Sequence, residues 1–104
     1  MNKKIFAANW KMYLNSNESK EFMIKINSNK DLFSEFDIMI FPSHTAISIV
    51  QDLAKELDNL KIGMQDCDIL TFGAVTGSNS ITSHKVDSCI VGHSERRNIF
   101  NEND

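Results

Sequence analysis

Short apolar runs alternate with polar turns and longer helix-like stretches four times along the chain. The runs cover residues 4–10, 36–41, 60–65 and 87–92. Pro42 ends the second run, because proline has no N–H to donate to a sheet. Strands that alternate with helices predict a parallel sheet, since parallel neighbours need crossover connections. The pattern therefore predicts an α/β fold of about four βα units, without a clear internal repeat.

Two helices are predicted between the first three runs, because apolar residues recur there at helical spacing. Ser16 can cap the first helix by accepting hydrogen bonds from its unpaired N–H groups, and Thr45 can cap the second. The predicted apolar faces are Phe22, Met23 and Ile26 in the first helix, and Ile49, Val50, Leu53, Ala54 and Leu57 in the second.

The stretch after the third run is predicted to be a long loop, punctuated by Gly73 and Gly77. A short, weakly patterned helix fits between residues 78 and 85. A last helix follows the fourth run. Ser94 can cap it, and the helix dipole favours Glu95 in its first turn.

Composition narrows the class of protein. The chain has 104 residues, 24% charged and 41% hydrophobic, which predicts one globular domain over residues 1–104. The net charge is −3, and no basic cluster indicates a nucleic-acid partner. The apolar runs are too short to span a bilayer, and the N-terminus lacks the apolar stretch of a signal peptide. We therefore expect no membrane partner and a cytoplasmic location.

The two cysteines, Cys67 and Cys89, have neither CxxC nor metal-ligand spacing. Reduced thiols are the expected state in a cytoplasmic protein. The sequence therefore predicts neither a disulfide nor a bound metal.

Polar side chains follow the ends of all four predicted strands, and such ends meet at one face of a parallel α/β sheet. These groups are Asn9 and Lys11, Ser43 and His44, Gln65 and Asp66, and His93, Ser94 and Glu95. Taken singly, each has an ordinary explanation as a turn residue, a cap or a solvated side chain. Lys11 would then be a solvated lysine, Arg96 and Arg97 could form a solvated basic pair, and His44 and His84 would lie at the surface. On this basis alone, Lys11 and His93 make only a weak anion-site hypothesis.

Three motifs strengthen that hypothesis. The runs Asn9-Trp10-Lys11-Met12, Gly73-Ala74-Val75-Thr76-Gly77 and Gly92-His93-Ser94-Glu95-Arg96-Arg97 strongly resemble the triosephosphate isomerase family, in order and in approximate separation. Phe100, followed by Glu102 and Asp104, fits as well. The resemblance covers essentially the whole chain. It implies an incomplete (β/α)₈ TIM barrel, with about the first four of eight βα units.

The resemblance also implies an activity. The family interconverts dihydroxyacetone phosphate and glyceraldehyde 3-phosphate in glycolysis and gluconeogenesis, as a homodimer. A carboxylate base moves a proton through an enediolate, without a cofactor or a metal. By resemblance, Asn9 and Lys11 bind the substrate, and His93 is the electrophile that hydrogen-bonds the carbonyl oxygen. A helix N-terminus next to His93 would favour its neutral form.

The remaining motif residues are implied to be supports. Glu95 matches the family's glutamate beside the lysine, where it could hold the ammonium in place. Ser94 and Arg96 are expected to support the site rather than to react. Thr76 lies in the loop that, in the family, inserts into the partner subunit.

The sequence also departs from the family. The glutamate base, the lid loop and the main phosphate loops belong to later strands of the family, and no carboxylate here matches the base. Ser78 stands where the family has a glutamate after Thr-Gly. The stretch over residues 80–91 is about one helical turn shorter than usual. We therefore expect a truncated chain that is inactive alone and whose two open sheet edges promote self-association.

Two alternatives stay open. The chain could be a half-enzyme that needs a second chain carrying the missing strands. It could also be a non-catalytic module that binds phosphate esters through Lys11 and His93, although it lacks a glycine-rich phosphate loop. A complete flavodoxin-like domain is disfavoured by the three motifs.

Overall fold

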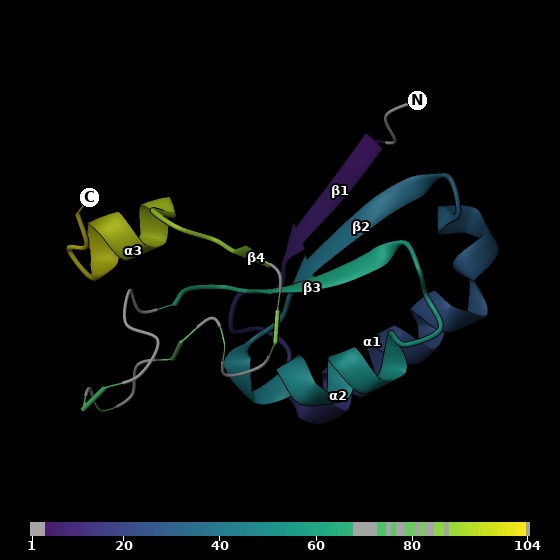
Figure 1. Cartoon of the computed structure of the whole chain (residues 1–104), viewed down its shortest axis with the longest axis horizontal. Helices are drawn as coiled ribbons and strands as arrows, with labels where there is room; N and C mark the ends of the chain where they lie inside the picture. Colours follow the sequence, from purple (N-terminus) through teal and green to yellow (C-terminus); the bar gives the residue numbers. More distant parts are fainter. Residues whose placement is uncertain are drawn as a thin grey trace.

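The computed structural model describes residues 4–67, 73, 74, 76, 79, 80, 82, 85, 86 and 88–103. Within this part of the chain, four strands form one parallel sheet in the order β1-β2-β3-β4 (Figure 1). The strands are β1 (Lys4–Asn9), β2 (Phe36–Phe41), β3 (Leu60–Met64) and β4 (Ser88–Cys89). The helices are α1 (Ser16–Ser28), α2 (Ile47–Leu53) and α3 (Ser94–Ile99), with 3₁₀ turns at Lys30–Phe33 and His44–Ala46. The predicted α/β fold, a curled parallel half-barrel, is confirmed.

The strands agree with the apolar runs, except at the end of the sheet. β2 has the predicted bounds, whereas β1 and β3 each end one residue early. β4 was predicted over residues 87–92 but contains only Ser88–Cys89. β3 ends at Met64, whose carbonyl accepts from Ile90 N at 2.9 Å. Beyond this bond, β4 has no partner strand among the described residues, so its ladder stops.

The cap of α1 is Asn15, and the prediction of Ser16 was wrong. The Asn15 Oδ1 atom accepts from Glu18 N at 2.9 Å, and Glu18 Oε1 accepts from Asn15 N at 3.2 Å. This reciprocal pair is a capping box, which satisfies two N–H groups that the helix leaves unpaired. Ser16 is the first helical residue, and its hydroxyl donates to Thr45 O at 3.2 Å.

Thr45 does not cap α2 either. It lies inside the 3₁₀ turn at His44–Ala46, which runs directly into the helix. The turn begins after Ser43, whose carbonyl accepts from Ala46 N at 2.9 Å. The possible helix between residues 78 and 85 lies largely outside the described residues.

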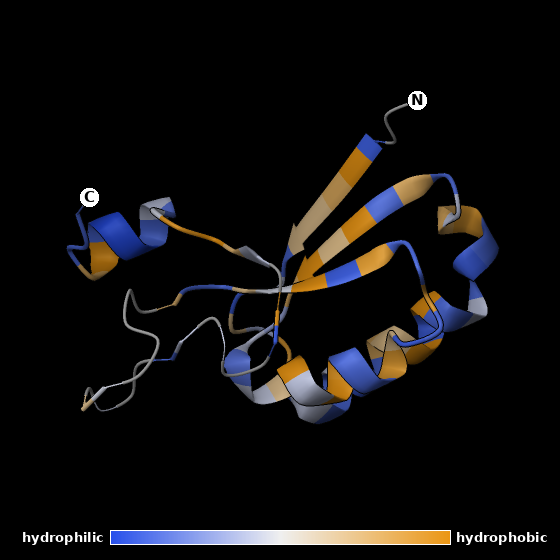
Figure 2. Cartoon of the chain, viewed as in Figure 1, coloured by the Kyte–Doolittle hydropathy of each residue, from blue (hydrophilic) through white to orange (hydrophobic). Residues whose placement is uncertain are grey.

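The core lies between the sheet and the pair α1 and α2, which pack on one side of it (Figure 1). Met23 of α1, and Ile47 and Val50 of α2, are completely buried. They pack with Ile40 and Met64 of the sheet, and Figure 2 shows apolar bands along the strands and on both helices. Ala54 and Leu57, expected on the helix face, are buried beyond the end of α2. Among the described residues, no helix is long and apolar enough to cross a membrane.

The amino-terminal half of β1 is exposed on both faces of the sheet. Ile5 and Phe6 are 63% and 56% exposed, although successive strand residues point to opposite faces. Within the described sheet, β1 pairs with β2 alone, so its other edge is open. Open strand edges are templates for pairing with another chain.

Gly63 allows close packing on the face of the sheet opposite the helices. A Cβ atom at this position would lie 2.5 Å from Ser88 Oγ and 2.6 Å from Phe41 Cδ1, and would clash with Phe41 Cε1.

We expect Gly63→Ala to lower the free energy of unfolding by about 1–3 kcal/mol, because the neighbours must move. Urea denaturation measures this change. Lys61→Ala, an exposed change on the same strand, is the control, and equal losses in both variants would contradict the clash.

The open edge of β1 predicts self-association of the isolated chain. Trp10 N donates to Phe41 O at 3.1 Å, so by alternation the N–H of Ala7 points away from β2. Proline at position 7 therefore removes a donor from the open edge alone. We expect associated wild-type chain and monomeric Ala7→Pro chain in sedimentation velocity, with similar circular dichroism.

The control is Ala8→Pro, because the N–H of Ala8 faces β2 and its loss should disrupt the sheet. A wild-type chain that remains monomeric at high concentration would refute the prediction. Equal association of the wild type and Ala7→Pro would mean that another surface is responsible.

Candidate active site

The ends of β1, β3 and β4 bring their polar side chains into one shallow pocket of about 150 Å³. Its polar lining includes Asn9, Lys11, Gln65, His93 and Glu95. Each lies at or after the carboxyl end of a strand, where parallel α/β sheets place their ligand-binding groups. The structure thus brings the sequence-predicted residues of the first, third and fourth strands together.

An ion pair joins the first strand to the last helix in this pocket. Lys11 Nζ lies 2.6 Å from Glu95 Oε1, and the two side chains are 37% and 44% exposed. The hydrogen bond from Lys11 holds the pKa of Glu95 below its ordinary range, and the same bond raises the pKa of Lys11. Lys11 is therefore a fixed cation rather than a freely solvated lysine, and Glu95 is a weak base.

His93 is the N-cap of α3, so the prediction that Ser94 caps this helix was wrong. His93 Nδ1 accepts from Glu95 N at 3.1 Å. A ring nitrogen that accepts carries no proton, so this bond selects the neutral imidazole with its hydrogen on Nε2. Glu95 Oε2 lies 3.4 Å from the same Nδ1, a contact that would attract only a protonated ring. We favour the neutral form, because the backbone N–H is the closer partner and Lys11 already binds the carboxylate.

Two further groups shape the turn that carries Lys11. Asn9 Oδ1 accepts from Lys11 N at 2.9 Å, so this asparagine also acts as a turn residue. Gln65 Nε2 donates to Lys11 O at 2.5 Å and to Phe41 O at 3.0 Å. Sequence reasoning noted Gln65 as a strand-end residue without giving it a role, because its partners lie far away along the chain.

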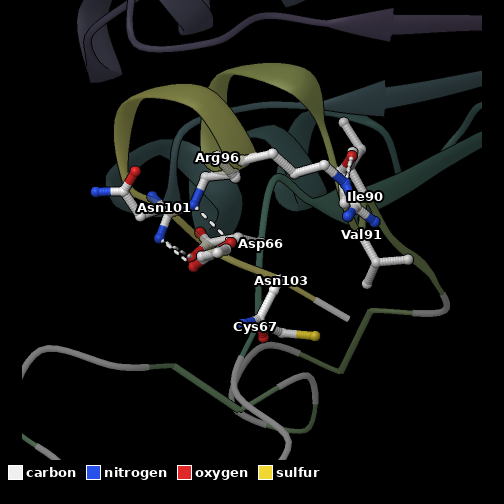
Figure 3. Close-up of a pocket in the computed structure, with 10 residues that line it drawn as sticks. Asp66, Cys67, Ile90, Val91, Arg96, Asn101 and Asn103 are labelled. Atoms are coloured by element: carbon white, nitrogen blue, oxygen red, sulfur yellow. Dashed lines mark hydrogen bonds and ion pairs between the residues drawn. The ribbon is translucent and has the colours of Figure 1, made fainter.

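Arg96 ties α3 to the end of β3, in the wall of a second and larger hollow of about 640 Å³ (Figure 3). Its guanidinium donates to both oxygens of Glu102, at 3.2 and 2.7 Å, and lies 3.7 Å from Asp66 Oδ2. It also stacks 4.3 Å from the centre of the Phe100 ring. Arg96 is therefore held by three other side chains, unlike the solvated arginine that it could be when taken singly.

The other predicted residues have less to do with the pocket. Ser94 is exposed in the first turn of α3, and Thr76 is exposed in the third loop. His44, expected at the surface, is partly buried, and its Nε2 lies 3.1 Å from Asp66 O. Ser78 and His84 lie outside the described residues. The contact of Thr76 with a partner subunit stays a prediction.

Neither cysteine is among the described residues that line this pocket. Cys67 and Cys89 are free thiols, and burial followed by contact with Cys67 raises the pKa of Cys89 to about 12. In the part of the chain that the structure describes, no group of three His, Cys, Asp or Glu side chains could hold a metal ion.

The fold and the pocket define a parallel α/β half-barrel with a fixed ammonium and a neutral imidazole at its strand ends. Residues 4–104 match the family model described as triosephosphate isomerase. The triosephosphate isomerase of Latilactobacillus sakei subsp. sakei (strain 23K) is 36% identical over 107 aligned residues, which cover 100% of this chain and 42% of that protein. That of Dictyoglomus thermophilum (strain ATCC 35947 / DSM 3960 / H-6-12) is 37% identical over 105, which cover 98% of this chain and 42% of that protein. The chain belongs to the triosephosphate isomerase family, and it spans about 42% of the length of these curated relatives.

The ion pair between Lys11 and Glu95 sets a pH window. The pKa of Glu95 is lowered, so its contribution to stability is complete above the ordinary glutamate pKa and is lost as pH falls through the lowered value. The pKa of Lys11 is raised, so its contribution is complete below the ordinary lysine pKa and is lost as pH rises through the raised value.

We expect Lys11→Met to return the Glu95 pKa toward the ordinary range, measured by carbon-13 NMR of its carboxyl carbon. An unchanged titration in this variant would show that Lys11 does not hold Glu95.

Proposed function

We propose that this chain forms the part of a triosephosphate isomerase site that binds the triose phosphate and polarises its carbonyl group. The observation that carries the proposal is the meeting of Lys11, His93 and Glu95 in one pocket. The Lys11 ammonium attracts the phosphate and stabilises negative charge on the substrate oxygen. Asn9 completes the turn and contributes a side-chain amide to the pocket.

The state of the imidazole supports its part in the reaction. With Nδ1 occupied by the Glu95 N–H, the His93 proton is on Nε2, which has no partner among the described residues. Nε2–H can therefore donate to the carbonyl oxygen as it gains charge in the enediolate. This neutral N–H group stabilises the negative charge that develops on the carbonyl oxygen during the reaction.

Isomerisation also needs a base that removes a proton from the carbon beside the carbonyl, and in the family this base is a carboxylate. Among the described residues that line the pocket, Glu95 alone carries a carboxylate. Lys11 binds it and lowers its pKa, which makes it a poor base. We therefore propose that the base comes from outside these four βα units, and that the 104 residues bind the substrate without converting it.

The source of the base separates two arrangements. It could belong to the same polypeptide, in a longer protein, or to a second chain that completes a half-enzyme. The open edge of β1 gives such a partner strand a place to pair. We further propose a cytoplasmic role in glycolysis and gluconeogenesis, without a cofactor, in a homodimer that the loop around Thr76 helps to form. The exposure of Thr76 supports this last point.

An isomerase assay tests the proposal in two steps. We expect no turnover of glyceraldehyde 3-phosphate by the chain alone, and turnover after mixing with the remaining C-terminal segment of the Latilactobacillus sakei relative. His93→Ala, purified identically, should lower the restored rate by at least about 10²-fold, because a positioned proton donor contributes that much. The variant also controls for host enzyme.

Turnover by the chain alone that vanishes in His93→Ala would show that a base exists within these residues. A restored rate that His93→Ala leaves unchanged would exclude His93 as the electrophile.

A further inference from the structure

The Lys11 backbone adopts a conformation that lysine rarely occupies. Its φ angle is +52°, in the left-handed region, where the Cβ atom of any residue but glycine crowds the backbone. Such a conformation persists only where the surroundings hold it. The side chain that leaves this backbone is the one that reaches Glu95. The geometry of the pocket thus depends on whatever holds the Lys11 peptide.

Two side chains hold it, one at each end of the residue. Asn9 Oδ1 accepts from the Lys11 N–H at 2.9 Å. Gln65 Nε2 donates to the Lys11 carbonyl at 2.5 Å. The same nitrogen donates to Phe41 O at 3.0 Å, and that oxygen also accepts from Trp10 N at 3.1 Å. One amide nitrogen from the end of β3 therefore joins the ends of β1 and β2.

We propose that Gln65 is a positioning residue, which locks the strained Lys11 backbone so that its ammonium sits between Glu95 and the substrate. The inference rests on the proposed function, in which Lys11 binds the phosphate. It assigns Gln65 no contact with the reacting atoms.

The chemistry of glutamine suits this task. Its amide nitrogen carries two hydrogens, one for each carbonyl oxygen. Glutamate has the same shape but would place a carboxylate against two carbonyl oxygens, and leucine has no donor. Asparagine is one methylene shorter and cannot reach both strands from the same backbone position. Loss of the Gln65 bonds frees Lys11 to relax out of the left-handed region. This relaxation moves the Lys11 ammonium away from Glu95.

The alternative is that Gln65 only stabilises the sheet, and the chain itself offers a matched control. Asn59 Nδ2 also donates to two backbone carbonyls, Phe33 O at 2.8 Å and Phe36 O at 2.7 Å. These bonds lie at the opposite end of the strands, because Phe36 begins β2 and Phe41 ends it. Asn59→Leu and Gln65→Leu thus each remove two similar bonds, and only the second is near Lys11.

The experiment compares these variants with the wild-type chain by NMR. We expect Gln65→Leu and Gln65→Glu to weaken binding of glycerol 3-phosphate, a non-reacting triose phosphate analogue, about tenfold, the value of one hydrogen bond to a charged group. The Lys11 ammonium should also lose its raised pKa, and the Lys11 carbon shifts should lose their left-handed signature. Asn59→Leu should leave all three unchanged, even if it lowers the melting temperature as much as Gln65→Leu does.

Lys11→Met separates this inference from the proposed function. If Lys11→Met binds the analogue as tightly as the wild type, the proposed function fails. If Lys11→Met loses binding while both Gln65 variants keep it, the positioning inference alone fails. The wild-type chain allows a further test, which does not depend on the folding of any variant. The Gln65 side-chain amide hydrogens should exchange slowly with solvent, and exchange at the rate of a free amide would overturn the inference.

Discussion

The ion pair between Lys11 and Glu95 connects the two ends of the described chain, and the candidate site depends on it. The 2.6 Å contact spans 84 positions of sequence, from the turn after β1 to the first turn of α3. Through it the pKa of Glu95 is lowered and that of Lys11 is raised. The same residue, Glu95, gives its backbone N–H to His93, so one glutamate sets both the position of the ammonium and the tautomer of the imidazole.

The sheet explains why such distant residues meet. Parallel strands place their carboxyl ends at one edge, and β1, β3 and β4 each deliver one or two polar groups there. The packing below is apolar and continuous, from Met23 through Ile47 to Met64. The core and the candidate site therefore adjoin, since the completely buried Met64 ends β3 and Gln65 follows it directly. Gly63 lies in the same region, where its missing side chain lets Phe41 and Ser88 approach.

Much of the fold could be predicted from the sequence, because it depends on local patterns. The bounds of β2 followed from its apolar run and Pro42. The cap of α1 was misplaced by one residue, although Glu18, three residues after Asn15, carries the signal of a capping box. The short β4 could not be predicted, because its length is set by where β3 ends. The contact of Lys11 with Glu95 was anticipated by family resemblance alone. The two hydrogen bonds of Gln65, to the carbonyl groups of Lys11 and Phe41, could not be predicted from the residues near Gln65 in the sequence.

The short ladder of β4 has a consequence for the response to salt. Two residue pairs join β4 to β3, and α3 lies beyond β4, away from α1 and α2 (Figure 1). The helix is held to the strand ends by charged contacts, Glu95 to Lys11 and Arg96 to Asp66. Dissolved ions screen such contacts, whereas sulfate strengthens the burial of apolar groups. A rising sulfate concentration therefore acts in opposite directions within this chain: it weakens the charged contacts of the helix that follows His93, and it strengthens the apolar core between the sheet and the helices α1 and α2.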